Sequence, residues 1–320
     1  MDADSLIDRR RLRRKLGFWR AAAILVAVLA IGATLWWSLP GRSAGAHIAR
    51  ISISGVVTDD TKLLATIEKA AASDAVKAIV VSLSTPGGTT YGGERIYRAI
   101  EAARASKPVV ADVRSLAASA GYMIAAAADH IVAGETSIVG SIGVLFQYPQ
   151  VSELMDKIGV ELKEIKSAPL KAEPSPFHPA SPAAEAMIRA MVMDSYDWFV
   201  DLVAERRGMP RDEVLRLADG SIYTGRQSLE NGLVDALGGE AAIRAYLTSR
   251  EIDAELEFVD WKPRGERSFG VLPEILAGVQ ALVRRNAPIV SISDEIDRLG
   301  GGKLFLDGLV SNWQAGAPSP

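Results

Sequence analysis

The chain has no cysteine and only three histidines among its 320 residues. Without cysteine, disulfide bonds, thiolate metal ligands and cysteine nucleophiles are excluded. Three histidines leave little material for a histidine-based metal site, and we expect neither a metal nor a cofactor. Catalytic chemistry in such a chain has to come mainly from hydroxyl, carboxyl and amine groups.

Basic charge is concentrated in the first 20 residues. This segment holds seven Arg or Lys and three Asp, whereas the whole chain has 36 basic and 39 acidic residues and a net charge of -3. The body of the chain is therefore acidic, which argues against nucleic acid as a partner. Since 48% of the residues are hydrophobic, the chain can bury a sizeable core, and neither a disordered tail protein nor a disulfide mini-protein fits.

One long uncharged run is present, at residues 21–39, which read AAAILVAVLAIGATLWWSL. As a helix it would be roughly 28 Å long, close to the thickness of the hydrocarbon core of a bilayer. Basic residues before such a span stay in the cytoplasm. We therefore expect a cytoplasmic segment at 1–20, a transmembrane anchor at 21–39 and a linker at 40–46, with the rest of the chain across the membrane. The alternative is a cleaved secretory signal, whose apolar region is usually shorter than this run.

From His47 onward, β-branched runs alternate with helical periodicity. Such alternation predicts an α/β fold with right-handed crossovers around a parallel sheet. We place this domain at 47–250 and a C-terminal extension at 251–320. The expected elements are strands at 48–54, 76–83 and 109–113, helices at 61–73 and 94–105, a helix starting near Ser119, and short strands near Ile131 and Ile142.

A proline-rich loop at 169–182 interrupts the alternation. Ser181 can cap, and Pro182 can open, a long helix that runs to about Arg207. Its apolar positions recur at helical spacing, so we interpret its methionines, among them Met187 and Met191, as core residues. Further on, residues 275–283 place one apolar face on a short helix, which fits either a subunit interface or the chain's own core.

The first candidate site is the turn Thr85-Pro86-Gly87-Gly88, which follows a buried strand. Paired glycines let the backbone approach a ligand and turn its N–H groups toward an anion. An ordinary tight turn between a strand and a helix would need the same residues. By itself this motif is weak.

The second candidate is Ser119, which leaves a strand and opens a helix among small neighbours. A serine in such a place has an exposed hydroxyl and the positive end of a helix beneath it, which favours a developing oxyanion. The pattern G-x-S-x-G is absent, because Ala117 stands where its first glycine would be. Either Ser119 or Ser115 can equally well be a simple helix cap.

A nucleophilic serine needs a base, and no histidine is an obvious one. His130 begins a predicted strand, His47 lies next to the membrane exit, and His178 lies among prolines. Lys171 lies in an apolar, loop-like segment, but a lysine acts as a base only when burial lowers its pKa. An ordinary solvated lysine is the alternative interpretation.

Several motifs over residues 47–240 resemble those of the signal peptide peptidase A family in its short bacterial form, and they keep the order and spacing found in that family. They are TPGG at 85–88, AASAGY at 117–122, VGSIGV at 139–144, SAPLK at 167–171, DSY at 194–196, FV at 199–200, RGMP at 207–210, YTGRQ at 223–227 and GLVD at 232–235.

This resemblance implies a Clp-protease/crotonase-like fold of repeated ββα units and a serine-lysine dyad. Ser119 then matches the nucleophile, Lys171 the general base, and Ser141 the serine that hydrogen-bonds the lysine amine. The oxyanion donors would be the N–H of Ala120 and that of Gly87 or Gly88. The family more usually has glycine at the position of Ala120, which raises a question about the size of the pocket.

The resemblance further implies a serine endopeptidase anchored in the bacterial inner membrane, with its catalytic domain on the periplasmic side. Its substrates would be released signal peptides and other short apolar peptides, and its assembly a homo-oligomeric ring, expected to be an octamer. Two alternatives belong to other classes of protein. One is a crotonase-like acyl-CoA enzyme, and the other is a catalytically silent membrane scaffold.

Overall fold

The computed structural model describes residues 19–20, 22–30, 45–263 and 310–312, which belong to two units, Met1–Gly45 and Ala46–Pro320. In the first unit, residues 22–30 are helical. Within the described ranges, no helix has both the length and the apolar character that a membrane span requires. Most of the anchor predicted at 21–39 lies outside the described residues, and so does the apolar face predicted at 275–283.

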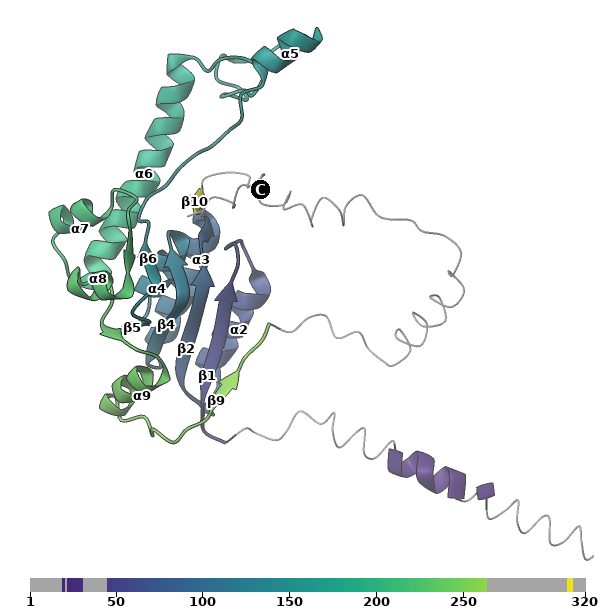
Figure 1. The fold of residues 1–320 in the computed structure, drawn as a ribbon. Coiled ribbons are helices and arrows are strands. Elements are labelled where there is room, and N and C mark those ends of the chain that lie inside the picture. The colour runs from purple at the N-terminus through teal and green to yellow at the C-terminus, as the bar shows by residue number, and fades with distance from the viewer. Residues whose placement is uncertain (1–18, 21, 31–44, 264–309, 313–320) are drawn as a thin grey trace, which may run out of the picture. The chain divides into compact units, whose positions relative to one another are not determined.

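A mainly parallel sheet of eight strands forms the centre of the second unit (Figure 1). One path through it runs β7-β6-β4-β2-β1-β9, while β5 pairs with β4 and β8. Only the β6–β7 pairing is antiparallel. The strands are β1 (His47–Ser54), β2 (Val76–Thr85), β4 (Val109–Ala118), β5 (His130–Ala133), β6 (Ile138–Gly140), β7 (Ile222–Thr224), β8 (Ala236–Leu237) and β9 (Phe258–Asp260).

Helices cover both faces of this sheet, and a separate strand pair lies beside it. The pair consists of β3 (Gly87–Thr89) and β10 (Val310–Asn312), which run antiparallel. The helices are α2 (Thr61–Ala72), α3 (Thr90–Arg104), α4 (Ala120–Ala126), α5 (Ser152–Ile158), α6 (Pro182–Arg207), α7 (Arg211–Leu217), α8 (Gly225–Glu230) and α9 (Glu240–Ser249). The mixed α/β fold predicted from the alternation is confirmed.

Strand β2 shows why this sequence supports two apolar layers. Its side chains alternate between the two faces, so that Ala78 and Val80 pack in the layer of α9, while Ile79 and Leu83 pack in the larger layer of α2, α3 and α4. Each large aliphatic side chain buried in this way stabilises the fold by about 1.5–3 kcal/mol. Because both faces are covered, the centre of the strand, residues 78–81, reads as a continuous apolar run.

The structure corrects three details of the predicted elements. The short strand expected near Ile142 lies at Ile138–Gly140. The helix expected from residue 94 begins at Thr90, because the Thr89 hydroxyl accepts a hydrogen bond from the Gly92 N–H at 3.1 Å and caps an earlier turn. Ser115, one of the two predicted caps, does not lie at a helix end but within β4.

Helix α6 has the predicted bounds, and its first residue follows the predicted cap. The Ser181 hydroxyl accepts a hydrogen bond from the Ala184 N–H at 3.2 Å. The interpretation of the methionines was wrong, because Met187 and Met191 are 37% and 41% exposed. The amino-terminal part of α6 extends beyond the sheet, so no layer of the described residues covers its apolar face (Figure 1).

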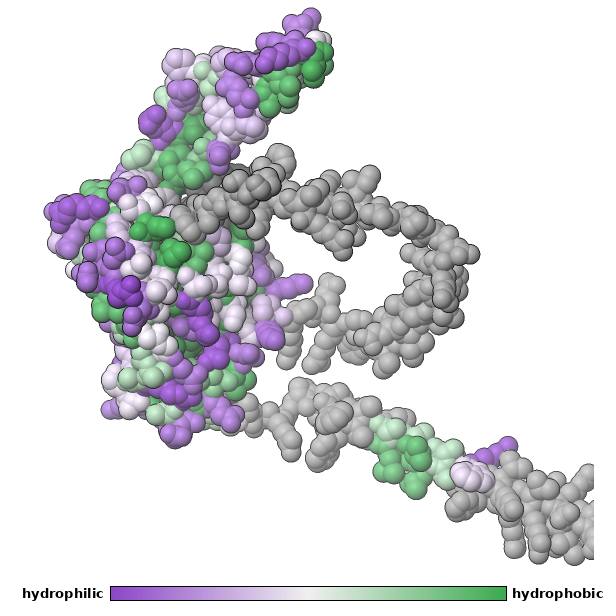
Figure 2. All heavy atoms as spheres, viewed as in Figure 1, coloured by the Kyte–Doolittle hydropathy of each residue, from purple (hydrophilic) through white to green (hydrophobic). Residues whose placement is uncertain are grey.

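We call residues 144–193 the arm. It contains α5 and the amino-terminal part of α6, and it projects away from the sheet (Figure 1). Only Ser175 and Ala184 are buried within it. Apolar side chains gather at its far end, over α5 (Figure 2). Those of its large apolar residues that are at least 45% exposed are Leu154, Ile158, Val160, Leu162 and Ile165.

Candidate active site

Ser119 lies where β4 ends and α4 begins, in a strained backbone conformation with φ 59° and ψ -120°. A positive φ is uncommon for any residue with a side chain and is found mostly where the surroundings impose it. Here the Ser119 N–H donates to the Gly140 carbonyl at 2.8 Å, and its own carbonyl accepts from the Tyr122 N–H at 2.9 Å. The residue is 1% exposed. In α/β-hydrolases a sharp, strained turn from strand to helix of this kind presents the nucleophile.

The capping interpretation of the two serines is not supported. Ser119 makes no side-chain capping hydrogen bond to α4. Ser115 lies where the register between β2 and β4 shifts, and its hydroxyl oxygen is 2.8 Å from that of Ser84. Ser119 therefore stands at the start of α4 without capping it through its side chain, whereas Ser115 supports a local irregularity of the sheet.

Two glycines let the start of α4 pack closely on its neighbours. A Cβ at Gly121 would lie 2.7 Å from Thr85 Cγ2, and one at Gly93 would lie 3.0 Å from the Cβ of Ala120. Gly93 of α3 thus makes room for the Ala120 methyl group, which explains how alanine is accommodated at this position. The Ala120 N–H lies in the first turn of α4, where a backbone donor has no partner within the helix.

The hydrogen bonds of β3 distinguish Gly87 from Gly88 as the predicted oxyanion donor. The Gly87 N–H donates to the Thr85 hydroxyl at 3.1 Å. The Gly87 carbonyl and the Thr89 N–H both bond to Val57, at 2.8 and 2.9 Å. Since backbone groups alternate along a strand, the polar groups of Gly88 face the opposite edge, where β10 places Ser311 beside Gly88. Of the two glycines, Gly88 has the better placed N–H.

Ser119 opens into a pocket of about 380 Å³. Ser141 lines the same pocket, is 9% exposed and has φ 53°, and its N–H donates to the Ser221 carbonyl at 2.7 Å. The structure therefore brings these two predicted residues together. The remaining lining is mainly apolar and comes from three segments: Ile142, Gly143, Val144 and Leu145; Val192, Met193 and Tyr196; and Ala218, Asp219 and Gly220.

Lys171 lies on the arm and is exposed in this chain. Its N–H donates to the Ala168 carbonyl at 3.1 Å within a turn, and the residue is not part of the Ser119 pocket. The described residues of the single chain therefore do not provide the burial that a neutral amine requires.

A charged cluster on the arm was missed by the sequence analysis. The Lys166 ammonium lies 2.7 Å from Glu164 and 2.6 Å from Glu173, and His178 Nε2 lies 3.5 and 3.4 Å from the same two carboxylates. The carboxylate and imidazole ligand atoms are close enough to hold a metal ion, but the lysine ammonium is already their cation. Residues 164, 166, 173 and 178 carry no recognisable motif that would have indicated the cluster.

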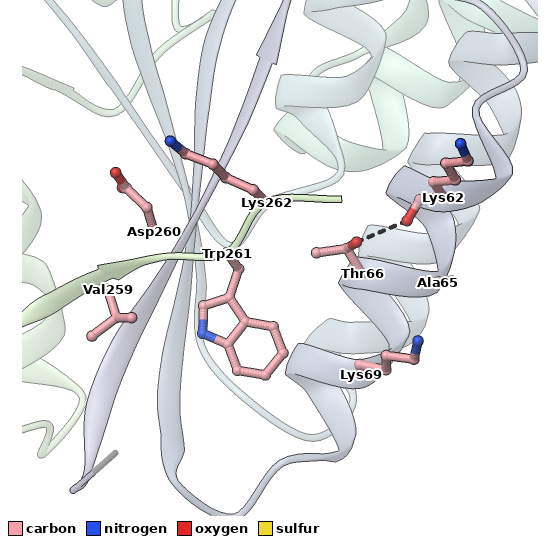
Figure 3. Close-up of a pocket in the computed structure, with 8 residues that line it drawn as sticks. All are labelled: Lys62, Ala65, Thr66, Lys69, Val259, Asp260, Trp261 and Lys262. Atoms are coloured by element: carbon pink, nitrogen blue, oxygen red, sulfur yellow. Dashed lines mark hydrogen bonds between the residues drawn. The ribbon is translucent and has the colours of Figure 1, made fainter. Parts of the chain in front are cut away.

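His130 and His47, the other two histidines considered as possible bases, lie away from the Ser119 pocket. His130 stacks on Tyr246 with ring centroids 4.2 Å apart, and burial holds the pKa of its imidazole below the usual value. His47 Nε2 is 3.1 Å from the indole nitrogen of Trp261. Trp261 belongs to a separate pocket of about 490 Å³ between α2 and β9 (Figure 3). Lysines and one aspartate provide its charge, and the hydroxyl of Thr66 in its lining donates to the Lys62 carbonyl at 2.8 Å.

Comparisons with known proteins point to a family of proteases. The model of peptidase family S49 matches residues 101–252, which include Ser119, Ser141 and Lys171. A Synechocystis sp. protein described as a protease is 36% identical over 204 residues, which is 62% of this chain and 72% of that protein. An Enterococcus faecium protein described as a signal peptide peptidase is 37% identical over 63% of this chain and 62% of its own length.

A solved structure of a membrane-bound stomatin-specific protease is also similar, with a TM-score of 0.49 and 16% identity over 69% of this chain and 100% of that one. The chain thus belongs to peptidase family S49 and is a serine protease similar to signal peptide peptidase A.

Proposed function

We propose that this protein is a membrane-anchored endopeptidase that cleaves released signal peptides and other short apolar peptides with a Ser119–Lys171 dyad. The observation that carries this proposal is the strained, nearly enclosed position of Ser119 at the start of α4. The Ser119 hydroxyl attacks the peptide carbonyl while neutral Lys171 takes its proton. Lys171 then passes that proton to the leaving amine, and water repeats the cycle on the acyl-enzyme.

The N–H groups of Ala120 and Gly88 stabilise the oxyanion in this scheme. The first stands at the start of a helix, and the second belongs to an edge that faces away from Val57. Ser141, in the same pocket as Ser119, hydrogen-bonds the lysine amine once Lys171 is in place. The chain adopts the Clp-protease/crotonase-like arrangement of ββα units in this proposal.

A ring of identical subunits provides the enclosure that Lys171 lacks in the single chain. The arm supports this proposal, because its large apolar side chains are exposed and gather at one end. Monomeric proteins rarely expose a large contiguous apolar patch unless it binds a partner. In such a ring, arms of neighbouring subunits cover one another and exclude water from the dyad. An octamer is the assembly that the family resemblance favours.

Peptide substrates bind as an extended strand along the edge of β3. Adding a strand in this way gives affinity through backbone hydrogen bonds, which do not depend on the side chains of the peptide. The apolar pocket beside Ser119 selects the residue next to the scissile bond. The pairing of β10 with β3 supports this, since it is an extended segment in antiparallel register on the same edge. An uncharged run at 21–39 preceded by basic residues supports anchoring in the inner membrane, with this site on the periplasmic side.

Labelling with a fluorophosphonate probe tests the nucleophile. The intact protein should take up one probe per chain, and mass spectrometry should locate it on Ser119. Ser119→Ala should lose both labelling and hydrolysis of an apolar fluorogenic peptide, whereas Ser115→Ala should retain both. Labelling of any other serine, or hydrolysis by Ser119→Ala, would contradict the assignment.

A further inference from the structure

The turn that carries Lys171 is closed by an ion pair between residues on its two sides. Lys166 precedes the turn and Glu173 follows it, and their charged atoms are 2.6 Å apart. The Glu173 side chain is only 7% exposed and the Lys166 side chain 19%, on an arm in which only Ser175 and Ala184 are fully buried. Burial of such a pair is costly unless its remaining hydrogen-bonding groups are satisfied.

Those groups are satisfied by neighbours on the same arm. The second oxygen of Glu173 accepts from the Ser175 N–H at 3.2 Å, and Lys166 also bonds to Glu164 at 2.7 Å. Hydrogen bonding to Lys166 holds the pKa of both carboxyls below their usual range, and the two carboxylates raise the pKa of Lys166. His178 lies at the rim of the cluster, within 3.5 Å of both carboxylates.

The turn between Lys166 and Glu173 has a backbone geometry that needs support. Ala172, next to Lys171, has φ 60°, which is unfavourable for a residue with a Cβ. Two backbone hydrogen bonds hold the turn, from Lys171 N–H to Ala168 at 3.1 Å and from Glu173 N–H to Leu170 at 3.4 Å. The second is long, so the ion pair is the main bond that joins the two sides of the turn.

We propose that Lys166 and Glu173 are positioning residues, which clamp the turn at 167–172 and thereby fix the direction in which Lys171 is presented to the active site. This rests on the proposed function of Lys171 as the base. Their opposite charges also neutralise each other, so that Glu173 does not stand as an isolated anion two residues from the amine. A misplacement of a catalytic group by about 1 Å can lower the rate by about a hundredfold.

The full-length protein with single substitutions tests this proposal. Lys166→Met removes the ammonium and keeps the length of the side chain, and we expect kcat for an apolar peptide to fall by about ten- to a hundredfold with little change in KM. Lys166→Arg keeps the cation and should recover most of the activity. The matched control is Lys163→Met, since Lys163 also forms a pair with a glutamate, Glu161, at 3.5 Å, but both its side chain and that of Glu161 are about four-fifths exposed.

Hydrogen exchange provides a readout that does not depend on turnover. Measured in an inactive Ser119→Ala background, the amides of Lys171 and Glu173 should exchange faster in Lys166→Met than in Lys163→Met. Equal kcat in the two methionine variants overturns the positioning role, and so does a fall in kcat without faster exchange. Retained activity in Lys171→Met would instead refute the base assignment, while the exchange result would still show whether the ion pair clamps the turn.

Discussion

The two members of the proposed dyad lie in regions of opposite character. Ser119 is 1% exposed and lies between a central strand and a fully buried helix. The backbone on both sides therefore fixes the direction in which its side chain points. Lys171 lies on the arm, in which only Ser175 and Ala184 are buried. The nucleophile is therefore fixed by the fold itself, whereas the position of the base depends on the ion pair of Lys166 and on whatever encloses the arm. Substitutions in the two regions should therefore differ in their effects on stability and on turnover.

The largest contrast is expected at Lys171. Lys171→Met should lower turnover of an apolar peptide by about 10³-fold or more, because the general base is lost. The melting temperature should stay that of the native protein, since the side chain is exposed. Turnover by Lys171→Met close to that of Lys163→Met would refute the assignment.

A pair of substitutions on α6 measures the same contrast in stability. Phe199 is 0% exposed and Met191 is 41% exposed, eight residues earlier on the same helix. Phe199→Ala should lower the free energy of unfolding by about 3–5 kcal/mol, because it leaves a cavity in the core. Met191→Ala should lower it by about 0.5 kcal/mol or less. Urea denaturation at several protein concentrations would check both, and a large cost at Met191 that grows with concentration would show that the arm is buried in an assembly.

Substitutions at two buried glycines, Gly88 and Gly225, distinguish an effect on stability from an effect on catalysis. A Cβ at Gly88 would lie 2.0 Å from the Val57 carbonyl oxygen, and one at Gly225 would lie 2.0 Å from that of Gly134. Each glycine-to-alanine change should cost about 1–3 kcal/mol of stability through overpacking. Only Gly88→Ala should also lower kcat, by about 10²-fold, since it displaces the proposed oxyanion donor. Equal kcat in the two variants, measured where both are folded, would remove Gly88 from the oxyanion site.

Much of the fold could be predicted because its signals are local. Strand β2 contains an uninterrupted run of apolar residues, and α6 has Ser181 before it, Pro182 at its start and Gly208 after its end. The position of Ser119 was also predictable, since a β-branched run gives way to small helix formers at that point. In each case the neighbouring residues in the sequence determine the structure.

Features that depend on distant segments could not be predicted. Helical periodicity identified one apolar face on α6, but it does not say whether another layer covers that face, and among the described residues Met191 is 41% exposed. The shift of register beside Ser115 arises from pairing with β2, and the Lys166 cluster from a turn that brings 166 and 173 together. The sequence likewise gave no indication that residues 310–312 pair with Gly87–Thr89.

That last pairing leads to the smallest expected effect. Since β10 lies on the edge of β3 proposed for substrates, the two should compete, and weakening β10 should make the edge more accessible. Ser311→Pro removes a backbone N–H that can pair with Gly88, whereas Ser311→Ala keeps it. If β10 occupies the edge for about two-thirds of the time, the apparent KM for a short peptide should fall about threefold in Ser311→Pro, with kcat unchanged. An unchanged KM in Ser311→Pro, matching that of Ser311→Ala, would mean that peptides reach Ser119 without using the edge that β10 covers.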